Sequence, residues 1–148
     1  MDAAEKKQLE ITACKIRMGI IEGVHSAKSG HPGGSLSIAE ILTYLYFKAM
    51  NIDPENPKKD DRDRFVLSKG HAAPALYSAL AYRGYFDPEL LKTLRHIGSI
   101  LQGHPDMKHI PGVDMSTGSL GQGISAAVGM ALSAKHFGDN YKVYAVLG

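Results

Sequence analysis

Apolar residues recur every three or four positions in the first third of the chain, which is the spacing of one face of an α-helix. The first pattern covers residues 5–27, and its apolar members are Leu9, Ala13, Ile16, Ile20 and Val24. A second pattern covers residues 37–50. Ser37 and Glu40 have the spacing of a capping box, which predicts that the second helix begins at Ser37. The Pro-Gly-Gly run at residues 32–34 predicts a break between the two helices.

Two short apolar runs predict buried strands, at residues 64–68 and 142–147. Between them, helices are predicted for residues 73–83, for a short stretch after an Asp-Pro pair at residues 87–88, and for a stretch that follows the glycine-rich run at residues 118–123 and ends near residues 137–138. Strands that alternate with helices predict an α/β fold with a parallel sheet flanked by helices. Because two strands are too few for a doubly covered sheet, we expect an incomplete fold, in which residues 1–148 form a single partial domain with several apolar helix faces uncovered.

Composition narrows the class of protein. The 148 residues are 44% hydrophobic, and the 17 basic and 15 acidic residues are interspersed, with a net charge of +2. This even distribution lacks the basic patch of a nucleic-acid-binding protein or of one that binds an anionic membrane. No apolar run is long enough for a membrane span. The single Cys14 cannot form an internal disulfide, and its helical context predicts a buried or half-buried apolar role. We therefore expect a cytoplasmic protein.

Three histidines occur in one context, because His31, His71 and His104 each follow a glycine in a predicted loop. Loops at strand ends commonly contact ligands in α/β proteins, and glycine allows a close approach of the backbone. The alternative is that each histidine simply lies on the surface, but the repetition of the same context in three separate turns favours a shared site. A zinc site fits poorly, since there is one cysteine and no ligand pair at finger or helical spacing.

A glycine-rich run at residues 116–123 precedes a predicted helix. Backbone amides at such a position can bind a phosphate or a polar heterocycle, although the run can also be a turn that packs closely on a neighbour. It is not a Rossmann fingerprint, because no strand leads directly into it. The residues alone therefore predict an incomplete α/β domain with a polar cleft lined by histidine and glycine, suited to a phosphorylated ligand.

These loops, in this order and spacing, resemble the diphosphate-binding N-terminal part of transketolases. The motifs that carry the resemblance are Ser29-Gly30-His31-Pro32-Gly33-Gly34, Arg64-Phe65-Val66-Leu67-Ser68-Lys69-Gly70-His71-Ala72, Gly103-His104-Pro105 and Thr117-Gly118-Ser119-Leu120-Gly121-Gln122-Gly123. The related deoxyxylulose-phosphate synthases usually lack the His-Pro-Gly-Gly and Ser-Lys-Gly-His-Ala forms. The resemblance is strongest to the N-terminal subunit of split bacterial or archaeal transketolases.

The resemblance implies thiamine diphosphate as cofactor and a two-carbon ketol transfer between sugar phosphates in the pentose phosphate pathway. It implies that His31 and His104 contact hydroxyls of the donor sugar, and that His71 reaches the cofactor diphosphate close to the substrate. It further implies a segment along the aminopyrimidine and thiazolium rings of the cofactor, formed by Gly118, Ser119 and Leu120.

The resemblance also implies parts that this sequence does not contain. In the family, an Asp-Gly pair and a later Asn follow a strand of this kind and hold Mg²⁺ or Ca²⁺, so their positions would lie beyond Gly148 and no metal ligand is expected here. The activating glutamate belongs to a pyrimidine-binding domain on a C-terminal part or partner subunit, in a dimeric assembly. We therefore expect the chain alone to be inactive. The alternatives are a related thiamine enzyme such as a deoxyxylulose-phosphate synthase, or a truncated, non-catalytic binding module.

Overall fold

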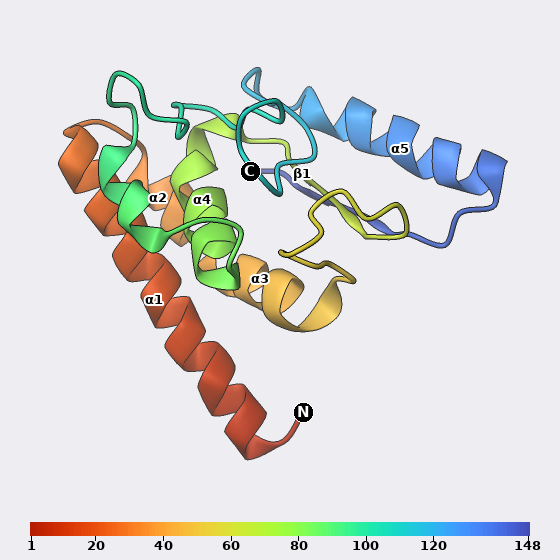
Figure 1. The fold of residues 1–148 in the computed structure, drawn as a ribbon, viewed down its shortest axis with the longest axis horizontal. Helices are drawn as coiled ribbons and strands as arrows, with labels where there is room; N and C mark the ends of the chain where they lie inside the picture. The colour runs from red at the N-terminus through yellow and green to blue at the C-terminus, as the bar shows by residue number, and fades with distance from the viewer.

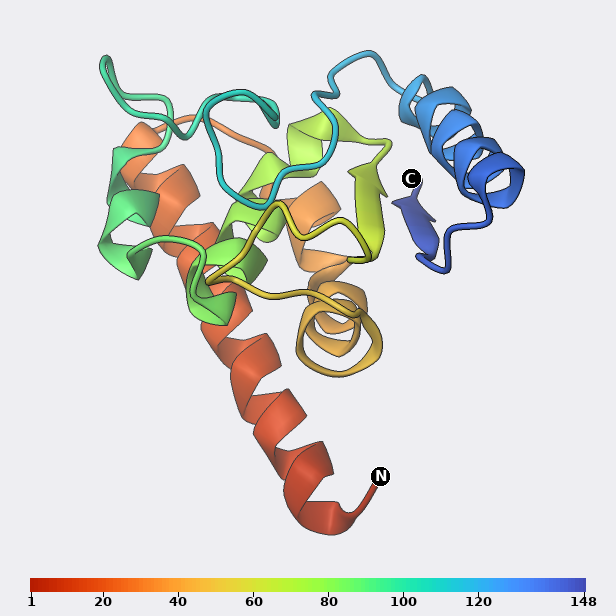
Figure 2. The same cartoon turned by 45° about the vertical axis from the view of Figure 1, so that its right-hand side comes forward.

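The computed structural model describes residues 1–148 and shows a helix-rich α/β arrangement with one small sheet (Figure 1). The N-terminal helices lie on one side of the molecule, and α5 with the C-terminal strand lies on the other (Figures 1 and 2). The elements in chain order are α1 Ala3–Ala27, α2 Pro32–Leu36, α3 Ala39–Tyr44, the π-helical η1 Leu45–Ala49, β1 Arg64–Leu67, the 3₁₀ turn η2 Gly70–Ala72, α4 Ala73–Arg83, the 3₁₀ segment η3 Pro88–Thr93, α5 Gly123–Phe137 and β2 Val143–Val146.

The sheet has two strands, β1 and β2, which pair in parallel with Arg64 opposite Val143 and Leu67 opposite Val146. Parallel strands require a crossover connection, and here that connection runs through both α4 and α5. The predicted α/β class and both strand positions are therefore confirmed. β1 is buried as predicted, but β2 is only half-buried along its whole length.

Helix α4 is at the centre of the core. Every residue from Ala73 to Ala81 is buried, because α1 packs on one side of the helix and the α2–α3 region on another. Its four alanines allow this close packing, while Leu76 and Leu80 fill the larger spaces. α1 contributes Ile16 and Ile20, both fully buried. The core therefore anchors the start of α4, which follows directly from the loop that contains His71.

The region between α1 and α3 differs from its prediction in two ways. The Pro-Gly-Gly run does not simply interrupt the chain but forms the first residues of α2, with Pro32 at a helix start, where a missing amide is tolerated. The prediction of a capping box at Ser37 is wrong. The Ser37 hydroxyl donates to the Gly34 carbonyl oxygen at 3.0 Å, and α3 begins at Ala39 without a side-chain cap. Cys14 is also exposed rather than buried.

Residues 95–122 contain no helix or strand. This segment passes along the top of α4 toward the start of α5 (Figure 2). The outward side of α5 exposes large apolar residues, as expected for a partial domain; they are Ile124, Val128, Leu132 and Phe137. None of the helices combines the length and the hydropathy that a membrane span requires.

Candidate functional site

The site begins at the carboxyl end of β1, where Ser68-Lys69-Gly70-His71 leads into η2 and α4. This is the end of a parallel strand at which α/β proteins place ligands. His71 is half-buried there, and its ring lies next to that of His31, with centroids 5.3 Å apart and planes at 74°. A Cβ on Gly34 would lie 3.2 Å from Nε2 of His71, so α2 approaches the imidazole closely. Two of the three predicted histidines are therefore adjacent.

The third histidine, His104, reaches the same place on the irregular segment. A Cβ on Gly118 would lie 3.7 Å from its Cγ, so its ring packs against the glycine-rich loop. That loop lies close to the His71 turn, since a Cβ on Gly70 would be 2.8 Å from the carbonyl of Thr117. Four of the predicted site residues, the three histidines and Gly118, thus converge from separate loops.

Several basic side chains gather at this point. Burial lowers the pKa of His71, and the neighbouring His31, Lys69 and His104 lower it further. Lys69 is only 4% exposed, and its ammonium group has one hydrogen-bond partner, the Ser37 hydroxyl at 3.3 Å. No carboxylate pairs with it in the chain. Because a buried charge without a counterion is costly, this arrangement suits an anionic ligand.

Ser68 attaches the glycine-rich loop to the sheet through three hydrogen bonds. Its amide donates to the Val146 carbonyl of β2 at 2.8 Å. Its carbonyl accepts from the Gly121 amide at 3.2 Å, and its hydroxyl accepts from the Ile124 amide in the first turn of α5 at 3.0 Å. The strand end, the loop and the helix start are thereby held together.

The glycine-rich loop has unfilled capacity for a ligand. The Thr117 hydroxyl is buried and has no hydrogen-bond partner. A hollow of 220 Å³ lies along residues 115–119 and includes Ser119 and Gln122 in its lining. Leu120 is 63% exposed at the tip and does not line it. Ser119 and Leu120 therefore lie on the same loop as Gly118 but do not belong to the cluster formed by the three histidines and Gly118. A larger hollow of 380 Å³, between α1 and α3, involves none of these residues.

Three polar groups of the site were not predicted from the sequence. Lys69 and Thr117 lie inside motifs quoted above, yet lysine and threonine in a loop are usually exposed, so only the structure reveals their burial. Tyr77 occupies an apolar helix face, where a core role explains it equally well. The one signal for Tyr77 in the sequence was its spacing, because it follows His71 by six residues, or nearly two turns of α4.

Comparison with known proteins agrees with this geometry. Residues 8–145 match the family described as transketolase, thiamine diphosphate binding domain. The chain belongs to the transketolase family. It is 52% identical over 140 residues to the 6-deoxy-6-sulfo-D-fructose transketolase subunit SqwG of Clostridium sp. (strain MSTE9), and 46% identical over 140 residues to one of the subunits of the apulose-4-phosphate transketolase of Phocaeicola vulgatus. Both alignments cover 95% of this chain, and they cover 51% and 50% of those two relatives.

Solved transketolases have the same fold in this region. The transketolase from Leishmania mexicana superimposes with a TM-score of 0.91 at 35% identity, over 95% of this chain and 22% of that one. The enzyme from Campylobacter jejuni gives 0.90 at 36% identity, over 100% of this chain and 24% of that one. This chain therefore spans about half the length of its subunit-type transketolase relatives and about a quarter of the single-chain enzymes.

Proposed function

We propose that this chain forms a single partial diphosphate-binding domain of a transketolase. In a complete assembly, it would take part in transferring a two-carbon ketol unit from a ketose phosphate to an aldose phosphate. The observation that carries the proposal is the group of three histidines beside the buried Lys69, at the carboxyl end of β1 in a chain of this family. The names of two relatives, which describe them as transketolase subunits, support a partner subunit. In our proposal that subunit carries the pyrimidine-binding domain, and the assembly is dimeric.

The residues present fit thiamine diphosphate. Lys69 supplies a buried cation without a counterion, which suits a diphosphate. The partnerless Thr117 hydroxyl and the glycines of its loop leave hydrogen-bonding capacity and space for a polar ring. We therefore assign the diphosphate to Lys69 and His71, and the aminopyrimidine and thiazolium to Gly118, Ser119 and Leu120.

When bound, thiamine diphosphate supplies the carbanion chemistry that breaks and forms carbon–carbon bonds. The chain's own residues would position the reactants and manage protons. His31 and His104 are exposed beside the half-buried His71, so their imidazoles are free to bind hydroxyls of the donor sugar. A neutral imidazole can accept a hydroxyl proton, and the imidazolium can return it. His71, between Lys69 and the other two histidines, would hold the diphosphate next to the sugar.

A divalent metal does not fit the residues described. No group of three or more His, Cys, Asp or Glu side chains is placed to hold one, and Mg²⁺ or Ca²⁺ prefers several oxygen ligands. We assign no step to a metal in this chain. In our proposal, Mg²⁺ or Ca²⁺ and the activating glutamate belong to the complete enzyme, and the chain alone has no turnover.

Two measurements test this function. Calorimetry with thiamine diphosphate and MgCl₂ should show weak binding or none to the chain alone, and stronger binding once a C-terminal transketolase subunit is added. Ketol transfer should require that subunit.

In the assembly, His31→Ala should lower kcat/KM for the donor about 10²–10⁴-fold, the usual range for a lost proton-transfer group. His136→Ala, an exposed histidine of α5, is the matched control and should change nothing. Turnover by the chain alone, or full activity of His31→Ala, would contradict the proposal.

A further inference from the structure

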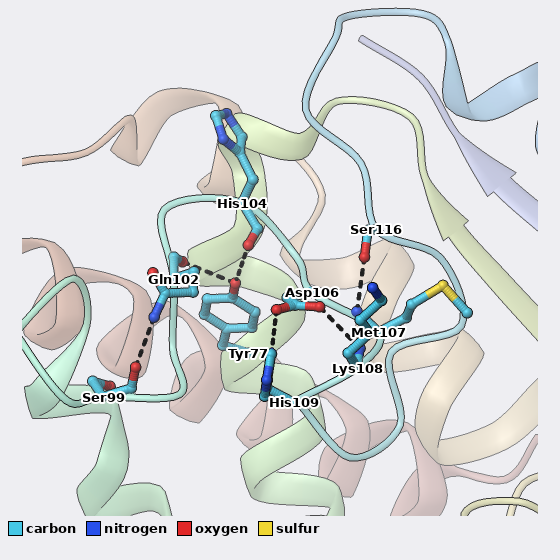
Figure 3. Close-up of polar contacts among 9 residues, drawn as sticks. All are labelled: Tyr77, Ser99, Gln102, His104, Asp106, Met107, Lys108, His109 and Ser116. Atoms are coloured by element: carbon cyan, nitrogen blue, oxygen red, sulfur yellow. Dashed lines mark hydrogen bonds and ion pairs between the residues drawn. The ribbon is translucent and has the colours of Figure 1, made fainter.

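A buried tyrosine lies directly beneath the loop that contains His104. Tyr77 of α4 is fully buried, and its hydroxyl oxygen lies 2.8 Å from the carbonyl oxygen of Gln102 and 2.8 Å from that of His104 (Figure 3). A phenol has a single proton to donate, so the two carbonyls share it. Both carbonyls therefore point toward the same point in the core.

The side chain of Leu101 anchors the loop in the core, but the hydrogen bonds of the loop are mostly local. Apart from the bonds to Tyr77, the hydrogen bonds of residues 99–109 join positions at most nine residues apart, all within or beside the same segment. The bond from the Met107 amide to the Ser116 hydroxyl, at 3.0 Å, spans those nine positions (Figure 3). Tyr77 instead connects the loop to a helix 25 and 27 residues away in sequence. These two hydrogen bonds therefore connect the backbone of the loop to α4.

The direction of the bond also orients the histidine. The His104 carbonyl points down to Tyr77, and its imidazole extends from the opposite side of the backbone (Figure 3). The ring packs there beside Gly118. Burial raises the pKa of the Tyr77 phenol well above its ordinary value, so the hydroxyl keeps its proton and is a donor at neutral pH.

We propose that Tyr77 is a positioning residue for His104: it holds the backbone at residues 102–104, so that the imidazole faces the glycine-rich loop and the donor sugar. The part of this inference that concerns the sugar rests on the proposed function. The part that concerns the loop does not, and the experiment separates the two.

The test compares Tyr77→Phe with Tyr46→Phe. Tyr46 is also a buried tyrosine, 3% exposed, but its hydroxyl has no hydrogen-bond partner, so its removal is the matched control. In NMR spectra of the chain, Tyr77→Phe should shift and broaden the His104 imidazole resonances, whereas Tyr46→Phe should leave them in place. In the unaltered chain, the Tyr77 hydroxyl proton should exchange slowly and show a through-space contact with residue 104. Unchanged His104 resonances in Tyr77→Phe, or a rapidly exchanging hydroxyl proton in the unaltered chain, would overturn the inference.

Kinetics of the assembled enzyme then test the connection to the sugar. Tyr77→Phe should raise the donor KM about threefold to tenfold, the factor expected for one lost hydrogen bond, with a smaller change in kcat. In a His104→Ala background, Tyr77→Phe should have no further effect on KM. An equal effect in both backgrounds would show that Tyr77 acts through general stability and would refute the positioning role. A normal KM in His104→Ala itself would instead refute the proposed function of His104, while the NMR result would still stand.

Discussion

Replacing Gly70 with alanine tests the close approach that brings the His71 turn against the glycine-rich loop. A Cβ at this position would lie 2.8 Å from both the carbonyl carbon and oxygen of Thr117, and 2.9 Å from Cα of Gly118. Ordinary contacts begin near 3.4 Å. The opposing atoms are backbone and cannot rotate away, so the two loops must separate by about 0.6 Å.

The expected cost follows from these contacts. Forcing an extra methyl group into a packed region costs about 1–3 kcal/mol. Alanine also restricts the unfolded chain more than glycine does, which offsets about 0.4–1 kcal/mol of that cost. We expect Gly70→Ala to lower the free energy of unfolding by about 1–2 kcal/mol, measured by urea denaturation of the chain with circular dichroism.

Gly129→Ala provides the control. Gly129 lies inside α5, and a Cβ there would meet nothing within 4 Å, so the same substitution should raise the free energy of unfolding by about 0.5–1 kcal/mol through helix propensity. If Gly70→Ala were as stable as the original chain or gained stability as Gly129→Ala does, the close approach of the two loops would be disproved.

Three further predictions concern charge and packing. The pKa of His71 in the folded chain is below its ordinary value of 6.5, so the contribution of this residue to stability is present above pH 6.5 and is lost as the pH falls. Bound inorganic pyrophosphate should raise the pKa of His71. An NMR titration of the free chain with a midpoint at or above 6.5 would contradict this prediction. Asp114→Ala should lower the free energy of unfolding by about 3–5 kcal/mol, since it leaves Arg62 without the partner of a largely buried ion pair. Asp61→Ala, at an exposed ion pair, should change it by less than about 1 kcal/mol. Similar urea midpoints for the two variants would refute the distinction. Ile16→Ala, at a fully buried position of α1, should cost about 2–5 kcal/mol in the same assay, and a smaller loss would mean that the core collapses around the cavity.

The elements with a regular apolar period were predictable from the sequence. Residues 73–83 form α4 with the predicted bounds, and the first helix differs from α1 by only two residues at its start. There, Asp2 accepts a hydrogen bond from the Glu5 amide at 2.8 Å and caps the helix. In such segments local preference and burial favour the same structure, which is why the pattern is reliable.

Prediction failed where a side chain has a choice of partners. Ser37 and Glu40 have the spacing of a capping box, but the Ser37 hydroxyl bonds to the Gly34 carbonyl and accepts from Lys69. Both of these interactions depend on the position of α2, which the local sequence does not reveal. The grouping of the histidines could be expected from their shared context, whereas the support from Tyr77 could not, because it depends on a contact across 27 residues.

The three hydrogen bonds of Ser68 have a thermodynamic consequence. Because one residue terminates bonds from β2, from the glycine-rich loop and from α5, local opening of the strand pair also releases the loop. A ligand that binds the ordered loop must then stabilise the sheet, and by reciprocity a more stable sheet must bind that ligand more tightly. Affinity and folding stability are therefore linked in this chain. Substitutions in the edge strand β2, distant in sequence from every histidine of the site, should alter ligand binding through this linkage.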